Sequence, residues 1–273
     1  MRKRAIKQLI IALVYLFILA CVIILILYFQ KPEPSCFDGI KNQDEEEIDC
    51  GGPCISCELV NIESLKVLWT EVIPSEKGFY DLAARIKNPN QNYGSGKISY
   101  KFEIYDYNDN FVSDYSGETF ILPNQTKYIV NTKIASDASV YRANIIFTNV
   151  DWKKPFNYNF PEFAVKQKEY YFLNDESLGV SQTKAILVNK SNFDFEEIGI
   201  DVLLFDSLDN LIAVNNNEIR TLPTGQERDF IVTWFHNIDG NVSRIEVEPE
   251  TNIFDSDNYV PFNKEGTEEF QKY

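Results

Sequence analysis

An uncharged apolar run at residues 9–29 constrains this chain more than any other feature of its sequence. It is 21 residues long and contains no proline, glycine or charged side chain. At 1.5 Å per residue, a helix of this length crosses the hydrocarbon core of a bilayer, which is about 30 Å thick. Only a helix satisfies its backbone groups there within a single segment. The sequence therefore predicts one transmembrane helix at 9–29.

The charges on the two sides of this run differ. Residues 1–8 carry four basic side chains and no acidic one, whereas a run of acids follows shortly after the apolar segment. Because positive charge marks the cytoplasmic side, residues 1–8 are expected to be a cytoplasmic basic tail. This predicts a single-pass protein of the plasma membrane with its N-terminus inside and its C-terminal domains extracytoplasmic. The basic residues are Arg2, Lys3, Arg4 and Lys7.

A cleaved signal peptide and a lipoprotein signal are the alternatives to a retained anchor. The apolar run is longer than a typical signal core, and no small-x-small cleavage site follows it. Residues 18–21, which end in Cys21, loosely resemble a bacterial lipobox. The chain nevertheless continues apolar over residues 22–29, where a mature lipoprotein turns polar. A retained signal anchor therefore fits the sequence better than either alternative.

Beyond the anchor the chain is strongly acidic. The first 31 residues hold five of the 26 basic residues and none of the 41 acidic ones, so residues 32–273 carry a net charge of −20. Such a domain repels nucleic acid and anionic headgroups, so no nucleic-acid partner is expected. A hydrophobic content of 44%, with 20 Phe and 15 Tyr, is ample for a packed core.

Four of the five cysteines lie close together in an acidic stalk, residues 30–57. An even set of cysteines in a short exported segment indicates two disulfides, with three connectivities that spacing does not separate. Crosslinks order such a segment because it is too short to bury a core. The Cys54-x-x-Cys57 spacing also suits zinc, which is the alternative. The predicted disulfide residues are Cys36, Cys50, Cys54 and Cys57.

The same stalk is rich in hard oxygen ligands. Calcium takes six to eight oxygens from turn-rich loops, although the spacing here is not that of an EF-hand. A solvated acidic loop is the competing interpretation. The candidate Ca²⁺ ligands are Asp38, Asn42, Glu45 and Asp49. Residues 36–57 also resemble the short cysteine-rich "DCGG" motif of bacterial and archaeal surface proteins, which implies an extracytoplasmic setting.

The remainder of the chain repeats itself with a period of about 100 residues. The sequence IYDYNDNF at 104–111 aligns with LFDSLDNL at 204–211, and Leu-Pro at 122–123 aligns with Leu-Pro at 222–223. Asn88 aligns with Asn189, and Arg142 with Arg244, with a drift of one or two residues. A period this long indicates two copies of a whole domain rather than a solenoid.

Within each copy, apolar residues alternate with polar ones, as in residues 80–87, 98–104 and 198–204. This period of two, interrupted by Asn, Asp, Gly and Pro, is typical of half-buried strands. We expect a mainly β protein with two tandem immunoglobulin-like β-sandwiches, at 58–164 and 165–263, followed by a polar tail at 264–273.

Short motifs in the first copy carry a family resemblance. The sequence FEIYD at 102–106 resembles the signature of FxLYD domains, and VLLFD at 202–206 is a degenerate copy of it. Asn-Pro-Asn at 88–90, with Gly117 and the Leu-Pro pair, is similar to the type 2 late-embryogenesis (WHy) domain. Both families imply an immunoglobulin-like or fibronectin-like sandwich and supply no catalytic residues. Asp106 and Asp206 are expected to cap the turns that follow their strands.

The segment joining the two copies, residues 151–163, contains two prolines and five aromatic residues. Such a segment is either a binding surface or the packing between two domains. The candidate binding residues are Trp152, Phe156, Tyr158 and Phe160. Sequons begin at Asn124, Asn189 and Asn241, a pattern that an Asn-rich chain also produces by chance.

The chain carries no recognisable catalytic motif. His236 is the single histidine, and no phosphate loop, HExxH or GxSxG is present. The sequence therefore favours a non-enzymatic, membrane-anchored binding or adhesion protein with a protein or envelope partner. The alternative is a structural spacer subunit of a cell-envelope assembly. A hydrolase, which would need converging carboxylates in a pocket, is the weakest of the three interpretations.

Overall fold

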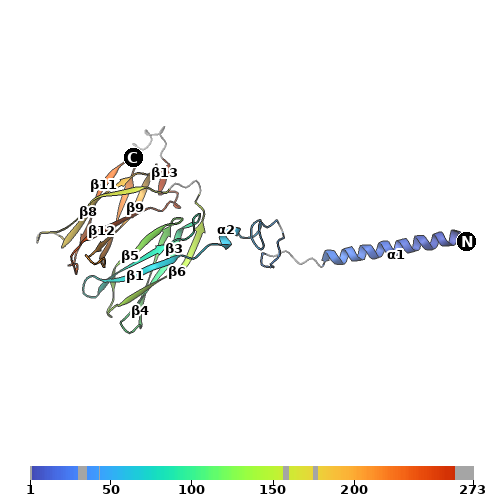
Figure 1. Cartoon of the computed structure of the whole chain (residues 1–273), viewed down its shortest axis with the longest axis horizontal. Helices are drawn as coiled ribbons and strands as arrows, with labels where there is room; N and C mark the ends of the chain where they lie inside the picture. Colours follow the sequence, from blue (N-terminus) through green and yellow to red (C-terminus); the bar gives the residue numbers. More distant parts are fainter. Residues whose placement is uncertain (1, 30–35, 43, 156–159, 175–177, 262–273) are drawn as a thin grey trace. The chain divides into compact units, whose positions relative to one another are not determined.

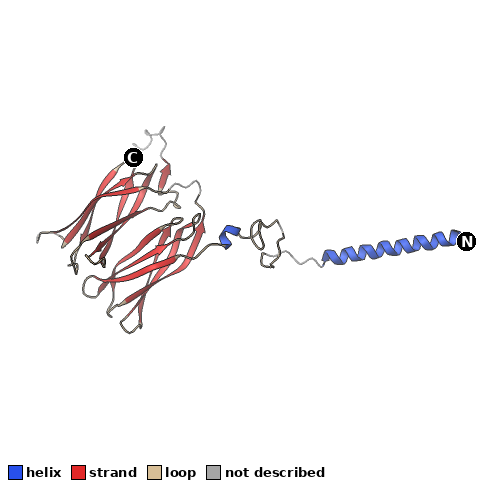
Figure 2. Cartoon of the chain, in the orientation of Figure 1, coloured by secondary structure: helices blue, strands red, loops and turns tan. Residues whose placement is uncertain are grey.

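The computed structural model describes residues 2–29, 36–42, 44–155, 160–174 and 178–261. These residues form one long helix, one short helix and thirteen strands, so the described chain is mainly β (Figures 1 and 2). Two compact units are present, residues 1–62 and 63–273.

The first unit begins with helix α1 (Arg2–Phe29). Its segment Ile6–Ile26 is long and apolar enough to cross a membrane, and its described side chains are exposed. Its length and composition alone do not distinguish a membrane span from a signal sequence near the N-terminus. The stalk follows, and it ends in a single helical turn, α2 (Cys57–Val60).

In the first half of the second unit, two three-stranded antiparallel sheets face each other. One sheet has the order β1-β2-β5 and the other β4-β3-β6. Their shared core includes Leu82, Ile86, Phe102 and Ile104, all fully buried. The strands of this first sheet pair are β1 (Lys66–Pro74), β2 (Phe79–Lys87), β3 (Gly94–Tyr105), β4 (Phe111–Ile121), β5 (Thr126–Ala135) and β6 (Arg142–Lys153).

The second half repeats this arrangement. One sheet has the order β11-β8-β7 and the other β10-β9-β12, with β13 added on β9. Trp234 is buried in the core between them and donates its indole N–H to Thr183 Oγ1 at 3.0 Å. The strands of this second sheet pair are β7 (Phe163–Phe172), β8 (Ser181–Asn189), β9 (Phe193–Phe205), β10 (Leu211–Leu222), β11 (Glu227–Trp234), β12 (Arg244–Glu250) and β13 (Tyr259–Pro261). Strand β7 begins before the boundary expected at 164/165.

The two copies share their turn chemistry as well as their strand order. Asp106 Oδ1 accepts the backbone N–H groups of Asn108 and Asn110. In the second copy, Asp206 Oδ1 accepts those of Leu208 and Asn210. Hydrogen bonds from the side-chain amides of Asn110 and Asn210, together with these backbone bonds, lower the pKa of both aspartates. The predicted repeat and the predicted capping role of both aspartates are confirmed.

A third cluster of buried residues joins the two sheet pairs. Ile73, Ala83 and Tyr128 come from the face of β1-β2-β5 that points away from its own core. Leu203, Phe205 and Val214 come from the face of β10-β9-β12 that points away from the core of the second sheet pair. We call this contact the seam. Because the two faces are not equivalent parts of the repeat, the seam is a head-to-tail contact between unlike surfaces.

Candidate functional site

The seam is the candidate functional site because it combines buried charge with three concave pockets. Differences between the copies explain where it forms. Leu203 and Val214 are paired across β9 and β10 and are buried in the seam. The equivalent pair in the first copy is Glu103 and Asp114, which are joined through Lys101 in ion pairs of 3.2 and 3.0 Å. The charged face of the first copy therefore remains in solvent, whereas the apolar face of the second is buried.

A charged network lies beside the apolar part of the seam. Lys127 from β5 is fully buried and ion-paired with Glu250 from β12. Glu248 accepts the backbone N–H of Tyr128 at 3.1 Å, and Glu246 accepts its hydroxyl at 2.9 Å. Three bonds thus tie β5 of the first pair to β12 of the second.

Carboxyl groups outnumber the lysine in this network. Burial, together with the negative charge of nearby Glu250, raises the pKa of Glu248 to about 7. Burial and the same neighbour also place the pKa of Asp201, on the adjacent strand β9, well above its usual range. One buried cation therefore faces a group of carboxyl groups that favours proton uptake.

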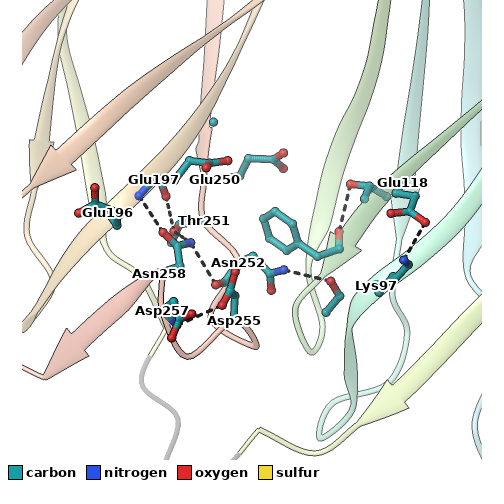
Figure 3. Close-up of a pocket in the computed structure, with 14 residues that line it drawn as sticks. Lys97, Glu118, Glu196, Glu197, Glu250, Thr251, Asn252, Asp255, Asp257 and Asn258 are labelled. Atoms are coloured by element: carbon teal, nitrogen blue, oxygen red, sulfur yellow. Dashed lines mark hydrogen bonds and ion pairs between the residues drawn. The ribbon is translucent and has the colours of Figure 1, made fainter.

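One end of the seam opens into an acidic cleft of about 470 Å³ (Figure 3). Asn252 Nδ2 donates to Gly96 O at 3.0 Å across the seam. Asn258 Nδ2 donates to Thr251 Oγ1, and Asn258 Oδ1 accepts the backbone N–H of Glu197 on β9. The excess of carboxylates gives this cleft a negative potential. The acidic residues lining it are Glu118, Glu196, Glu197, Glu250, Asp255 and Asp257.

The opposite end holds a mainly apolar pocket of about 400 Å³. Phe79 and Phe235 contribute partly exposed rings, and Lys133 Nζ lies 5.6 Å from the centroid of the Phe235 ring. Asp81 is buried at 4% exposure and accepts the backbone N–H of Lys133 at 2.8 Å. Burial raises the pKa of Asp81. The single histidine, His236, also lines this pocket.

A third pocket, of about 380 Å³, is lined by aromatic rings and by two arginine side chains. Trp69, Arg85 and Tyr128 form one row across strands β1, β2 and β5. The opposite wall comes from the second pair, where Arg244 stacks over Phe205 at 3.6 Å. Arg244 also bonds Asp209 and Glu246, which fixes this wall.

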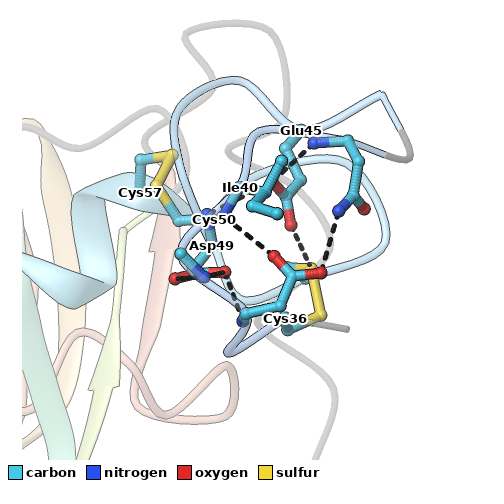
Figure 4. Close-up of a disulfide and its surroundings, with 10 residues drawn as sticks. Cys36, Ile40, Glu45, Asp49, Cys50 and Cys57 are labelled. Atoms are coloured by element: carbon cyan, nitrogen blue, oxygen red, sulfur yellow. Dashed lines mark hydrogen bonds between the residues drawn. A yellow bond between two sulfur atoms is a disulfide. The ribbon is translucent and has the colours of Figure 1, made fainter. Parts of the chain in front are cut away.

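The stalk is the other site predicted from the sequence. Its disulfides are Cys36–Cys54 and Cys50–Cys57, so the predicted two disulfides are confirmed and their pairing is resolved (Figure 4). Consecutive glycines make the tight turn between them. Gly51 and Gly52 have positive φ values, and a Cβ on either would lie 2.6 Å from Glu46 or from Asp44 O. Glycine is therefore sterically required at both positions.

The structure brings together the four candidate calcium ligands. Asp49 accepts the backbone N–H groups of Asp38 and Gly39, and buried Glu45 accepts those of Asn42 and Asp49. Asn42 Nδ2 donates to Asp38 Oδ2 at 2.9 Å. Glu45 Oε1 lies 3.2 Å from the Cys54 sulfur, which carries no proton in a disulfide. The carboxylates therefore act as acceptors for the loop backbone, and calcium binding remains a hypothesis.

The aromatic linker is described only in part. Trp152 lies on β6 and is half-buried, and Phe160 is 52% exposed. Phe156 and Tyr158 lie outside the described residues. Of the three sequons, the one at Asn189 is fully buried and bonded to the backbone, which removes it as a glycan acceptor.

Sequence reasoning missed the seam and its pockets. A comparison of the two copies could have indicated the seam, because Leu203 and Val214 are apolar where the first copy has the acidic residues Glu103 and Asp114. Another signal is the row Trp69–Arg85–Tyr128, whose equivalent in the second copy is Lys166–Ile186–Asp229. Where equivalent positions are apolar in one copy and charged in the other, the difference is not needed for the shared fold and indicates a surface with another role.

No family model matches this chain, and no curated protein matches it.

Proposed function

We propose that this chain is a non-enzymatic binding protein, anchored in the plasma membrane by α1, with its β domains outside the cytoplasm. The basic N-terminal tail, the disulfide-bonded stalk and the acidic remainder of the chain support this topology. Each sheet pair is proposed to be an immunoglobulin-like sandwich of the FxLYD or WHy type. The strand orders β1-β2-β5 and β4-β3-β6, repeated in the second pair, correspond to the A-B-E and C′-C-F orders of that fold.

The observation that carries the binding proposal is the seam. A buried apolar cluster and a set of interdomain hydrogen bonds hold the two pairs together, so the pockets have walls from both. Preformed concave pockets between domains are common ligand sites, because little conformational entropy is lost on binding.

Topology is tested by adding protease to intact cells or right-side-out vesicles. Cleavage of the β domains with protection of an N-terminal tag supports the proposal, and protected β domains contradict it.

Binding is tested by capture of isolated envelope material on the full-length protein in nanodiscs. The decisive variant is Leu203→Glu, which places in the seam the charge that the first copy carries at Glu103. We expect it to lose capture, and the Glu103→Ala variant, at a half-buried position outside the seam, to retain it. Equal capture by both variants, or none by the wild type, would contradict the binding proposal and favour the spacer interpretation.

A further inference from the structure

The third seam pocket contains an arginine whose hydrogen-bonding groups are not satisfied. Within the described residues, the Arg85 side chain has no hydrogen bond or ion pair, and its Nε is buried without a partner. Its guanidinium lies over the Tyr128 ring, 5.1 Å from the centroid. Leaving a buried donor unpaired is unfavourable, and guanidinium groups in such positions normally meet an acceptor. Arg85 lines the pocket, so a ligand bound there would offer an acceptor to its guanidinium group.

The fold itself does not require this arginine. The equivalent row of the second copy has Ile186 at the position of Arg85, between a lysine and an aspartate. Packing in the seam explains Trp69 and Tyr128, which contact its apolar cluster. It does not explain a charged side chain between them.

The charges around the pocket select the class of ligand. Arg85 and Arg244 are opposed by three carboxylates, so an anion would meet a net negative wall. A cation would meet the unpaired guanidinium. A neutral ligand avoids both penalties and still uses the donors and acceptors present. The three carboxylates belong to Glu71, Asp209 and Glu246.

The remaining polar groups suit hydroxyl groups. Within the described residues, the exposed Glu71 carboxylate has no hydrogen bond or ion pair and can accept from a hydroxyl. Arg85 can donate to another hydroxyl. Trp69, Tyr128 and Phe205 add flat apolar faces, against which the C–H faces of a sugar ring can pack.

We propose that this pocket, lined by Trp69, Arg85 and Tyr128 opposite Phe205 and Arg244, binds a neutral saccharide. The inference rests on the proposed binding function and names its ligand class. Trp69 and Tyr128 hold the ring, Arg85 donates to its hydroxyls, and Glu71 accepts from them. The head-to-tail seam supplies the second wall.

The test uses full-length protein in nanodiscs on an array of neutral di- to tetrasaccharides of hexose and N-acetylhexosamine. Uronate-containing and sulfated oligosaccharides of equal length form the comparison set. We expect selective retention of neutral saccharides, with affinity then measured by calorimetry. Arg85→Gln should weaken binding about tenfold or more, which corresponds to loss of one good hydrogen-bonded contact. Glu71→Gln, at an exposed position, should weaken it without disturbing the fold.

The matched control is Arg142→Gln. Arg142 stacks over Tyr105 at 4.2 Å and pairs with Asp109, as Arg244 does with Phe205 and Asp209, but it does not line the pocket. It should bind as the wild type does. Retention of anionic saccharides only, no retention at all, or unchanged affinity in both Arg85→Gln and Glu71→Gln would overturn the inference. Capture of envelope material without saccharide binding would overturn this inference and leave the proposed binding function intact.

Discussion

Asn189 makes the hydrogen bonds that Asn88 makes one repeat earlier. Each Nδ2 donates at 2.9 Å to the carbonyl of its Leu-Pro leucine, Leu122 or Leu222. Each Oδ1 accepts the backbone N–H two residues further along the chain. Both asparagines are fully buried. Asn88 thus joins the loop after β2 to the segment before β5. Asn189 joins the end of β8 to the segment before β11 in the same way.

Asn189→Ala should destabilise the second sheet pair by about 2–4 kcal/mol, because it leaves buried carbonyl groups without donors. Urea denaturation followed by Trp234 fluorescence measures the loss. The exposed Asn149→Ala variant, on strand β6, is the control and should change the free energy of unfolding by less than about 0.5 kcal/mol. Equal effects of the two variants would contradict the role assigned to Asn189.

Leu203→Glu should separate the two sheet pairs without unfolding either. A glutamate buried against Ile73 and Val214 costs several kcal/mol, so the seam opens to solvate it. We expect one thermal transition in the wild type and two in the variant. Amide exchange should increase on the strands that form the seam and not on β3, β4, β8 or β11. A single, unshifted transition in Leu203→Glu would show that the seam does not couple the pairs.

The seam should weaken as the pH rises through neutrality. Burial raises the pKa of Glu248 to about 7 in the folded protein, so folding favours the protonated form. This contribution is complete below the ordinary glutamate range and is lost as the pH rises through about 7. Lys127, Asp201, Glu246, Glu250 and the Tyr128 hydroxyl surround this carboxyl group.

Glu248→Gln keeps the acceptor for the Tyr128 amide and removes the charge. Between pH 5 and pH 8 the wild type should lose about 1–3 kcal/mol more stability than this variant, after allowance for partial solvent screening. Thermal melts at intervals across this range measure the difference. The surface variant Glu118→Gln should follow the wild type, and a wild-type profile parallel to that of Glu248→Gln would contradict the prediction.

The stalk should give two linked peptide pairs, Cys36 with Cys54 and Cys50 with Cys57, in mass spectrometry after proteolysis without reductant. Asp49→Asn should loosen the loop, because Asp49 accepts two backbone amides. Calcium at millimolar concentration should leave the melt of the full chain unchanged, because these carboxylates are engaged with the backbone. A calcium-dependent rise in melting temperature that is lost in Asp49→Asn would instead establish the calcium site.

Local patterns in the sequence determined the apolar helix, the β class, the repeat and the four disulfide cysteines. Each depends on periodicity, spacing or composition within a short window, as in the alternation of residues 198–204 or the capping aspartates at 106 and 206. The pairing of the cysteines was not determined, because the spacing of four cysteines within 22 residues is compatible with all three connectivities.

Only the tertiary structure decided which faces meet. Tyr128 and Glu246 are 118 residues apart in sequence, and no local pattern relates them. The seam depends on the fit of two unlike surfaces, one from each copy, and on burial that raises the pKa of Glu248. Burial and shape complementarity between distant segments arise only in the packed fold. In the sequence, Leu203 is therefore one apolar strand residue among several, whereas in the structure it forms a contact between the two sheet pairs.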